Sequence, residues 1–192
     1  YGLSRRHSGA FILPCRQPSQ SLSYVLGAFL GDGYLKPDSI RLEVTQHSFA
    51  TSFFNGLATL GFHPCMYRRH DRDFWVVIGN SVCFVRWIEA MPTSDLYALA
   101  NSYPWEFLRG FYEAEGSLRK RPLEITIHNH DEGLIKFVSS LLQQLSIPHS
   151  LCVNDSKIYK GKPYRMFLVR ILGPRDSKLE FLRRLEPCIK SY

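Results

Sequence analysis

Residues 25–33 read VLGAFLGDG, and residues 108–116 read LRGFYEAEG. Each stretch is an apolar run with one internal glycine, and each ends in an acid followed by a glycine. The two acids, Asp32 and Glu115, are 83 residues apart. A segment that occurs twice and delivers one carboxylate each time predicts two similar halves, with a pair of acids where they meet.

The similarity extends beyond these two motifs. Residues 40–46 and 123–129 alternate apolar and polar side chains, which is typical of half-buried strands. The carboxamides that end them, Gln46 and Asn129, are again 83 residues apart. In each copy a helix, a hairpin and a closing helix are predicted to follow, which makes each copy an α+β unit with an antiparallel sheet. These elements span 49–60, 65–69 with 74–78, and 81–90 in the first copy, and 131–145, 150–153 with 165–171 across a loop at 154–164, and 176–185 in the second.

We expect four segments along the chain: a basic lead-in (1–20), the first half (21–91), a linker (92–103) and the second half (104–192). The hydrophobic fraction of 45% is enough for a packed core. No apolar run approaches the about 18–20 residues of a membrane-spanning helix. No apolar signal segment follows the basic N-terminus, and the five scattered cysteines include no CxxC pair. We expect an intracellular protein with reduced thiols, no zinc site and no membrane partner.

The internal glycines, Gly27 and Gly110, predict that the two motif helices pack against each other. Glycine inside a helix costs about 0.5–1 kcal/mol relative to alanine, so a compensating close approach of two backbones is expected. The alternative, a tolerated glycine in each core helix, explains the matched offset less well. The glycines after the acids, Gly33 and Gly116, are interpreted as helix ends that use positive φ. A carboxylate at a helix C-terminus is unfavourable unless a cation lies beside it.

The formal net charge of +7 favours a polyanionic partner, with a membrane surface as the competing interpretation. On a basic protein, two converging carboxylates indicate metal-assisted hydrolysis of a phosphodiester. A bound Mg²⁺ would activate water and stabilise charge on the phosphate. The alternative is that Asp32 and Glu115 are two solvated acids at helix ends.

The paired motifs, their spacing and the repeated pattern of strands and helices resemble the LAGLIDADG homing endonuclease family. The likeness is closest to compact single-chain members with two motifs, of the type encoded in archaeal introns. It implies two αββαββα halves, with the motif helices at their interface and antiparallel sheets that form a saddle over the major groove of DNA. It also implies a monomer that cuts both strands of a long non-palindromic target and leaves 3′ overhangs.

The resemblance further implies roles for residues near the acids. Asp32 and Glu115 would hold Mg²⁺ or Mn²⁺, together with the main-chain carbonyls of Gly31 and Ala114. The side chains that would organise metal and water are Gln46 and Asn129.

Other residues are expected to contact DNA or assist at the second acid. Some members of the family have a lysine where this chain has Leu118, so Lys120 or Arg119 is expected to replace it. Outward strand positions and one loop carry side chains that can contact bases or phosphates, unless they are ordinary solvated charges. These are Arg41, Glu43, Thr45, Tyr67, Arg69, Arg72, Trp75, Arg119, Glu124, Thr126, Arg165 and Arg170, and, in the loop, Lys157, Lys160 and Lys162.

We therefore expect a site-specific, metal-dependent DNA endonuclease, a hydrolase of the homing type, whose partner is double-stranded DNA. Two alternatives share the scaffold: an RNA maturase that binds its own intron RNA, and a DNA-binding protein that does not cleave. A general RNA-binding α+β module would leave two acids at matched offsets unexplained. The expected location is the cytoplasm for an archaeal host and an organelle otherwise.

Overall fold

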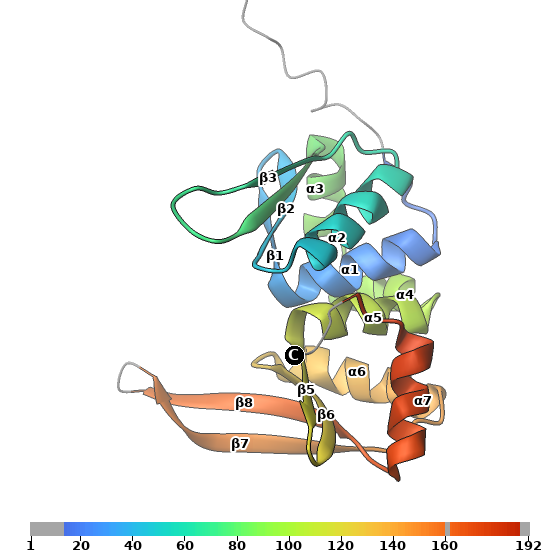
Figure 1. Cartoon of the computed structure of the whole chain (residues 1–192). Helices are drawn as coiled ribbons and strands as arrows, with labels where there is room; N and C mark the ends of the chain where they lie inside the picture. Colours follow the sequence, from blue (N-terminus) through green and yellow to red (C-terminus); the bar gives the residue numbers. More distant parts are fainter. Residues whose placement is uncertain (1–13, 160–161, 189–192) are drawn as a thin grey trace, which may run out of the picture.

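The computed structural model describes residues 14–159 and 162–188, in two halves that share the element order α–β–β–α–β–β–α (Figure 1). The α+β fold class predicted from the sequence, with two pseudo-symmetric halves, is confirmed. The segment expected as a linker contains an additional helix, α4 (Thr93–Asn101), which packs Leu96 and Ala100 into the core. The first half comprises α1 (Gln20–Asp32), β1 (Gly33–Lys36), β2 (Ser39–Val44), α2 (His47–Thr59), β3 (Cys65–Arg68), β4 (Trp75–Asn80) and α3 (Val82–Glu89). The second comprises α5 (Pro104–Glu115), β5 (Gly116–Lys120), β6 (Leu123–Asn129), α6 (Glu132–Gln144), β7 (His149–Tyr159), β8 (Lys162–Ile171) and α7 (Arg175–Leu185).

Each half contains one antiparallel sheet of four strands. The strand orders are β1-β2-β4-β3 and β5-β6-β8-β7, so each motif helix leads directly into an edge strand. Alternation along β2 buries Ile40 and Leu42 completely and leaves Arg41 and Glu43 half-buried on the opposite face. One face of each sheet is therefore covered by helices, and the other carries polar side chains.

Helices α1 and α5 lie side by side at the boundary between the halves (Figure 1). A Cβ added to Gly27 would stand 2.2 Å from the carbonyl oxygen of Phe107, and one added to Gly110 would stand 2.3 Å from that of Tyr24. Such separations leave no room for a side chain, so the two backbones touch at their glycines. The central pair of packed motif helices is confirmed.

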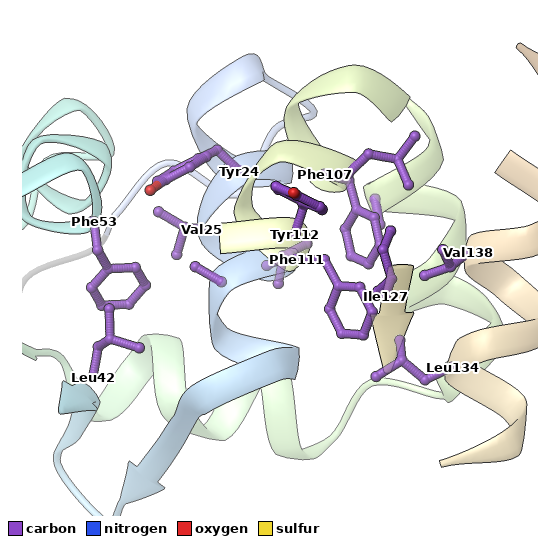
Figure 2. Close-up of a cluster of buried hydrophobic side chains, with 14 of the residues drawn as sticks. Tyr24, Val25, Leu42, Phe53, Phe107, Phe111, Tyr112, Ile127, Leu134 and Val138 are labelled. Carbon is purple, nitrogen blue, oxygen red and sulfur yellow. The ribbon is translucent and has the colours of Figure 1, made fainter. Parts of the chain in front are cut away.

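The hydrophobic core continues through this helix pair into both halves. Apolar side chains of α1 and α5 meet in the middle of the cluster that Figure 2 shows, and α2 and β2 flank them on one side, α6 and β6 on the other. The core therefore holds both motif helices and fixes where their C-terminal ends lie. The labelled residues, all of them buried, are Tyr24, Val25, Leu42, Phe53, Phe107, Phe111, Tyr112, Ile127, Leu134 and Val138.

The glycines that follow the acids serve a different purpose from the one predicted. Gly33 and Gly116 are extended, with φ of −83° and −78°, so neither uses positive φ. A Cβ on Gly33 would stand 2.6 Å from Cα of Phe29, and one on Gly116 would stand 2.3 Å from the carbonyl oxygen of Tyr112. In each half the backbone passes so close to the last helical turn that only glycine fits at this position.

Two further features differ from the sequence-based prediction. Strands β1 and β5 precede the predicted strand of each copy and pair with it, and their 4 and 5 residues are too few for periodicity to reveal. The loop predicted at 154–164 is largely strand, because β7 and β8 remain paired up to Tyr159 and Lys162, with a register shift between Asn154 and Lys157. Within the described ranges, no helix is long and apolar enough to cross a membrane.

Candidate functional site

The two motif acids lie at the same end of the central helix pair. Asp32 is the last residue of α1, and Glu115 is the last residue of α5. The helices remain in contact up to this end, since a Cβ added to Gly31 would stand 2.3 Å from Cβ of Ala114 and 3.2 Å from Cγ of Glu115. The small residues before the acids therefore bring the two carboxylates together at the boundary between the halves.

Burial disfavours the charged forms of both acids, and the charge of Asp32 adds to the effect at Glu115. The pKa of Glu115 is raised to about 7, first by burial and then by the charge of Asp32, while a hydrogen bond from Asn129 opposes the rise. The pKa of Asp32 is raised by burial, although its side chain keeps an exposed surface. Two carboxylates in this arrangement are destabilised as anions, and a cation between them would relieve that cost.

The two carboxamides expected at the site are placed differently. Asn129 is buried, and its Nδ2 donates a hydrogen bond to Oε1 of Glu115 at 2.6 Å. Its Oδ1 accepts one from the backbone N–H of Asp131 at 2.8 Å, which fixes the amide orientation. Gln46 precedes α2 and lines a cavity together with Asp32. Asn129 therefore holds its acid directly, whereas Gln46 stands beside its acid in the same cavity.

The residues expected to replace the family lysine lie along β5. Leu118, at the lysine position, is half-buried and packs against the core. Lys120 is exposed two residues further along, so it alternates onto the same face as Leu118. Arg119 alternates to the open face, where it lies 3.4 Å from Glu124. No hydrogen bond or ion pair joins Lys120 to Glu115 among the described residues.

The oxygen atoms available here suit a hard divalent cation. Two carboxylates converge, and the carbonyls of Gly31 and Ala114 belong to the last helical turns, where backbone carbonyls lack intrahelical partners. Mg²⁺, Mn²⁺ and Ca²⁺ prefer oxygen ligands of this kind, and Mg²⁺ keeps several waters, so few protein ligands suffice. Across the part of the chain that the structure describes, no group of three or more His, Cys, Asp or Glu residues is arranged to hold a metal ion. Two carboxylates with backbone carbonyls and water form a donor set of the kind that a magnesium-like ion takes.

The open face of the first sheet carries a connected polar network. Tyr34 donates a hydrogen bond to Glu43 at 2.6 Å, and Arg69 approaches the other oxygen of Glu43 at 3.4 Å. Arg69 also donates twice to Asp71, at 2.6 and 2.9 Å, and those bonds lower the pKa of the Asp71 carboxyl. Arg41, on β2 with Glu43, donates to Ser39 at 2.9 Å. These guanidinium groups are held in place before any ligand arrives.

The open face of the second sheet is organised around Glu124. Arg170 lies 2.9 Å from its carboxylate and Arg119 lies 3.4 Å away. On the same face Thr126 is within 2.8 Å of His128 Nε2. Arg170 and Thr126 are cross-strand partners, so these side chains form one continuous surface.

Two side chains expected on the open faces lie on the helix-covered faces instead. Trp75 shares the helix-covered face with Val77 and contacts His47 of α2, with ring centroids 4.3 Å apart. Arg165 alternates with the buried Phe167 and so lies on the helix side of β8, where its side chain is exposed. Neighbouring side chains of a strand alternate between the two faces, so Arg165 and Arg170 cannot share a face, and Trp75 lies on the face of Val77. Exposed as expected are Thr45, Tyr67 and Arg72, whereas Lys160 lies outside the described residues, as do the side chains of Lys157 and Lys162.

Sequence reasoning assigned no role to two residues around the site. One is Tyr34, which lies on β1, a strand too short for alternation to identify its residues. The other is Glu113, which occupies in the second motif the position that Leu30 occupies in the first. Its partners, described below, come from distant segments that no sequence period connects.

Comparison with known protein families places the second half in a recognised group. Residues 102–186 match the model of the LAGLIDADG-like domain. The chain is 27% identical over 149 residues to the uncharacterized protein MJ0398 of Methanocaldococcus jannaschii, and 32% identical over 162 residues to MJ0314 of the same organism. These matches cover 73% and 75% of this chain. The chain spans only 54% and 61% of the length of these two curated relatives.

Solved structures share the fold across both halves. The crystal structure of I-DmoI with DNA and Mn superposes with a TM-score of 0.63 at 16% identity, over 88% of this chain and 97% of that one. Variants of the homing endonuclease I-DmoI also match, as do I-DmoI with DNA and Ca and an I-DmoI variant with its target DNA in the presence of Mg. Full-length DUF199/WhiA from Thermotoga maritima matches with a TM-score of 0.63 at 13% identity, over 90% of this chain and 57% of that one. At these identities the likeness establishes the fold alone.

Proposed function

We propose that this protein, which has the LAGLIDADG fold and carries a LAGLIDADG-like domain at residues 102–186, is a metal-dependent endonuclease that cuts both strands of a specific DNA site. One observation carries the proposal: two helices packed backbone to backbone bring Asp32 and Glu115 together, where burial raises the cost of charge on both acids and the charge of Asp32 raises it further on Glu115. A stable fold has no need of two such carboxylates. A site for divalent cations explains them.

The residues that would hold the ion are Asp32 and Glu115, with the carbonyls of Gly31 and Ala114. When bound, Mg²⁺ or Mn²⁺ supplies Lewis-acid stabilisation of the phosphate and a water of lowered pKa. Asn129 keeps the Glu115 carboxylate aimed at the site through its 2.6 Å hydrogen bond. Gln46, beside Asp32, orders water on the first-half side. One acid for each half fits one scissile phosphodiester for each strand.

The open faces of the two sheets would bind the duplex. Arg41 and Arg69 lie on the first face, and Arg119 and Arg170 lie on the second. An antiparallel ribbon fits the major groove, and arginine can make paired contacts with guanine. The net charge of +7 adds attraction for the phosphate backbone. I-DmoI, which has the same fold, has been crystallised with DNA and Mn.

The finer features of the proposal follow from the family resemblance and from divergence of the two halves. Glu43 lies on one open face and Glu124 on the other, in different settings, so the two halves need not read the same sequence. We propose a monomer that recognises a long non-palindromic target, leaves 3′ overhangs and takes part in intron homing.

A binding function without cleavage is the second candidate. Leu118 replaces a lysine found in some members of the family, and the exposed Lys120 makes no described hydrogen bond or ion pair with Glu115. The same fold also occurs in DUF199/WhiA. On this alternative the protein binds DNA, or its own intron RNA as a maturase, and the acids have no catalytic role.

A plasmid-cleavage experiment tests the proposal. The substrates are supercoiled plasmids that carry the joined sequences flanking the coding region, and a library of genomic fragments, each incubated with and without Mg²⁺ or Mn²⁺. Linear product with 3′ overhangs is expected only with metal. Asp32→Asn and Glu115→Gln should abolish cutting and preserve binding in Ca²⁺, whereas the exposed-acid control Glu89→Gln should cut normally. Binding without cutting by the wild type supports the second candidate, and binding to intron RNA alone identifies a maturase.

A further inference from the structure

Glu113 is a buried carboxylate with a partner on each oxygen. Its residue is 4% exposed, on α5, two positions before Glu115. Oε2 accepts a hydrogen bond from the hydroxyl of Tyr24 at 2.5 Å, and Oε1 accepts one from the backbone N–H of Cys188 at 2.7 Å. No ion pair with lysine or arginine accompanies it in the described part of the chain. Two donors from distant segments therefore satisfy this charge.

The Tyr24 bond crosses the interface between the halves. Tyr24 belongs to α1, and its backbone oxygen marks the close approach to Gly110, one helical turn before Glu113. Its ring is buried under the guanidinium of Arg109, 4.5 Å from the ring centroid. Sliding α1 along α5 by one residue, about 1.5 Å, would break this bond. Apolar contacts alone resist such sliding less specifically, because they have no required direction.

The hydrogen bond from Cys188 connects Glu113 to the segment that follows α7. After α7 the chain turns through Glu186, which has a φ of 47°, and returns toward α5 (Figure 1). The thiol of Cys188 lies within hydrogen-bonding range of Ser48 and Ser52 on α2, and burial raises its pKa to about 12, so it remains a thiol. Helix α2 begins directly after Gln46. Residues 186–188 therefore form a strap that ties the second half to the first.

Only the second of the two motifs has a buried acid at this position, which indicates a role beyond general stability. The matching position in α1 is Leu30, which packs against the core. Glu113 also lines the cavity that contains Asp32 and Gln46. The Glu113 carboxylate thus connects α1, α5 and, through the strap, α2. Asp32 ends α1, Glu115 ends α5 and Gln46 precedes α2, so these helices position three of the four polar side chains assigned to the site.

We infer that Glu113 is a positioning residue: by bonding Tyr24 and the strap, it sets the separation of Asp32 and Glu115. The inference rests on the proposed function for the meaning of that separation. A displacement of about 1 Å at a reacting centre can cost about 10²-fold in rate. Loss of either bond should therefore lower cleavage far more than it lowers DNA affinity.

Two variants of the full chain and one control test this inference. Glu113→Gln and Tyr24→Phe each remove one hydrogen bond while preserving shape. Tyr112→Phe, on the same helix, removes the hydroxyl of a largely buried tyrosine, which makes no hydrogen bond to a described residue. Free Mn²⁺ measured by electron paramagnetic resonance, in the presence of DNA, reports the metal affinity of the paired acids. Single-turnover cleavage and gel-shift binding in Ca²⁺ separate chemistry from DNA affinity.

The expected result is a fall of about tenfold or more in cleavage rate for both variants and a weaker Mn²⁺ affinity. The DNA dissociation constant should change less than about threefold, and the control should match the wild type. A wild type that binds Mn²⁺ but does not cut would refute the proposed function, while a variant-dependent Mn²⁺ affinity would still support the positioning role. Unchanged Mn²⁺ affinity and rate in both variants would overturn it. Equal losses of DNA affinity and cutting, with a lowered unfolding midpoint, would overturn it too, because they indicate a purely structural role.

Discussion

The Glu115→Gln substitution should stabilise the metal-free protein at the pH where it abolishes cutting. Burial and the charge of Asp32 raise the pKa of Glu115 from 4.5 to about 7. A folded-state pKa above the unfolded value means that the folded state binds the proton more tightly. The contribution of this proton to folding stability is therefore fully present below about pH 4.5 and is lost as the pH rises through about 7. At about 1.36 kcal/mol per pKa unit, the loss is at most about 3 kcal/mol at pH 8.

The glutamine variant carries no charge and avoids this loss, and its side-chain oxygen can still accept the hydrogen bond from Asn129. The assay is urea unfolding in EDTA at pH 8 and at pH 4.5. We expect the variant to be more stable than the wild type by about 2–3 kcal/mol at pH 8 and to differ little at pH 4.5. Glu89→Gln, at the exposed end of α3, should change stability by less than about 0.5 kcal/mol at both pH values. Equal effects at the two pH values, or a variant less stable at pH 8, would refute the electrostatic account of the site.

Three other perturbations test separate parts of the account. Gly110→Ala should lower the free energy of unfolding by at least about 2 kcal/mol in thermal unfolding, because its methyl group would meet the Tyr24 carbonyl. The control Gly133→Ala on α6 should change stability little. A Gly110→Ala protein as stable as the wild type would contradict the backbone contact. Asn129→Ala should slow cleavage by about 10–100-fold at unchanged DNA affinity, and a normal rate would show that Glu115 needs no support. Arg170→Ala should weaken DNA binding and reduce the slope of log affinity against log salt by about 0.9 if it contacts a phosphate, while Arg183→Ala on α7 should leave the slope unchanged.

The motif glycines made much of the fold predictable. Gly27 and Gly110 at equal offsets indicated the helix contact, and the alternation of residues 40–46 and 123–129 indicated the central strands. The acids followed from the same repeat, because a fixed offset from a packed glycine places each carboxylate at the same helix end. Local sequence therefore contained the information that positions the pair.

Other features depend on contacts between distant segments. The purpose of Gly33 was misread because a close approach to the preceding helical turn and a positive φ call for the same residue type. The face on which Trp75 lies depends on the strand register, and a register shift of one residue exchanges the two faces. The bond between Glu113 and Cys188 joins residues 75 positions apart, and no periodic pattern signals such a contact.

A crystal structure of the protein with target DNA and Mn²⁺, phased or verified by the anomalous signal of manganese, tests the central claim most directly. We expect a manganese peak between the two motif helices, with oxygen atoms of Asp32 and Glu115 within about 2.0–2.4 Å of bound ions. Manganese bound elsewhere, with the two carboxylates directed away from the DNA, would contradict the assignment of these acids as the metal site.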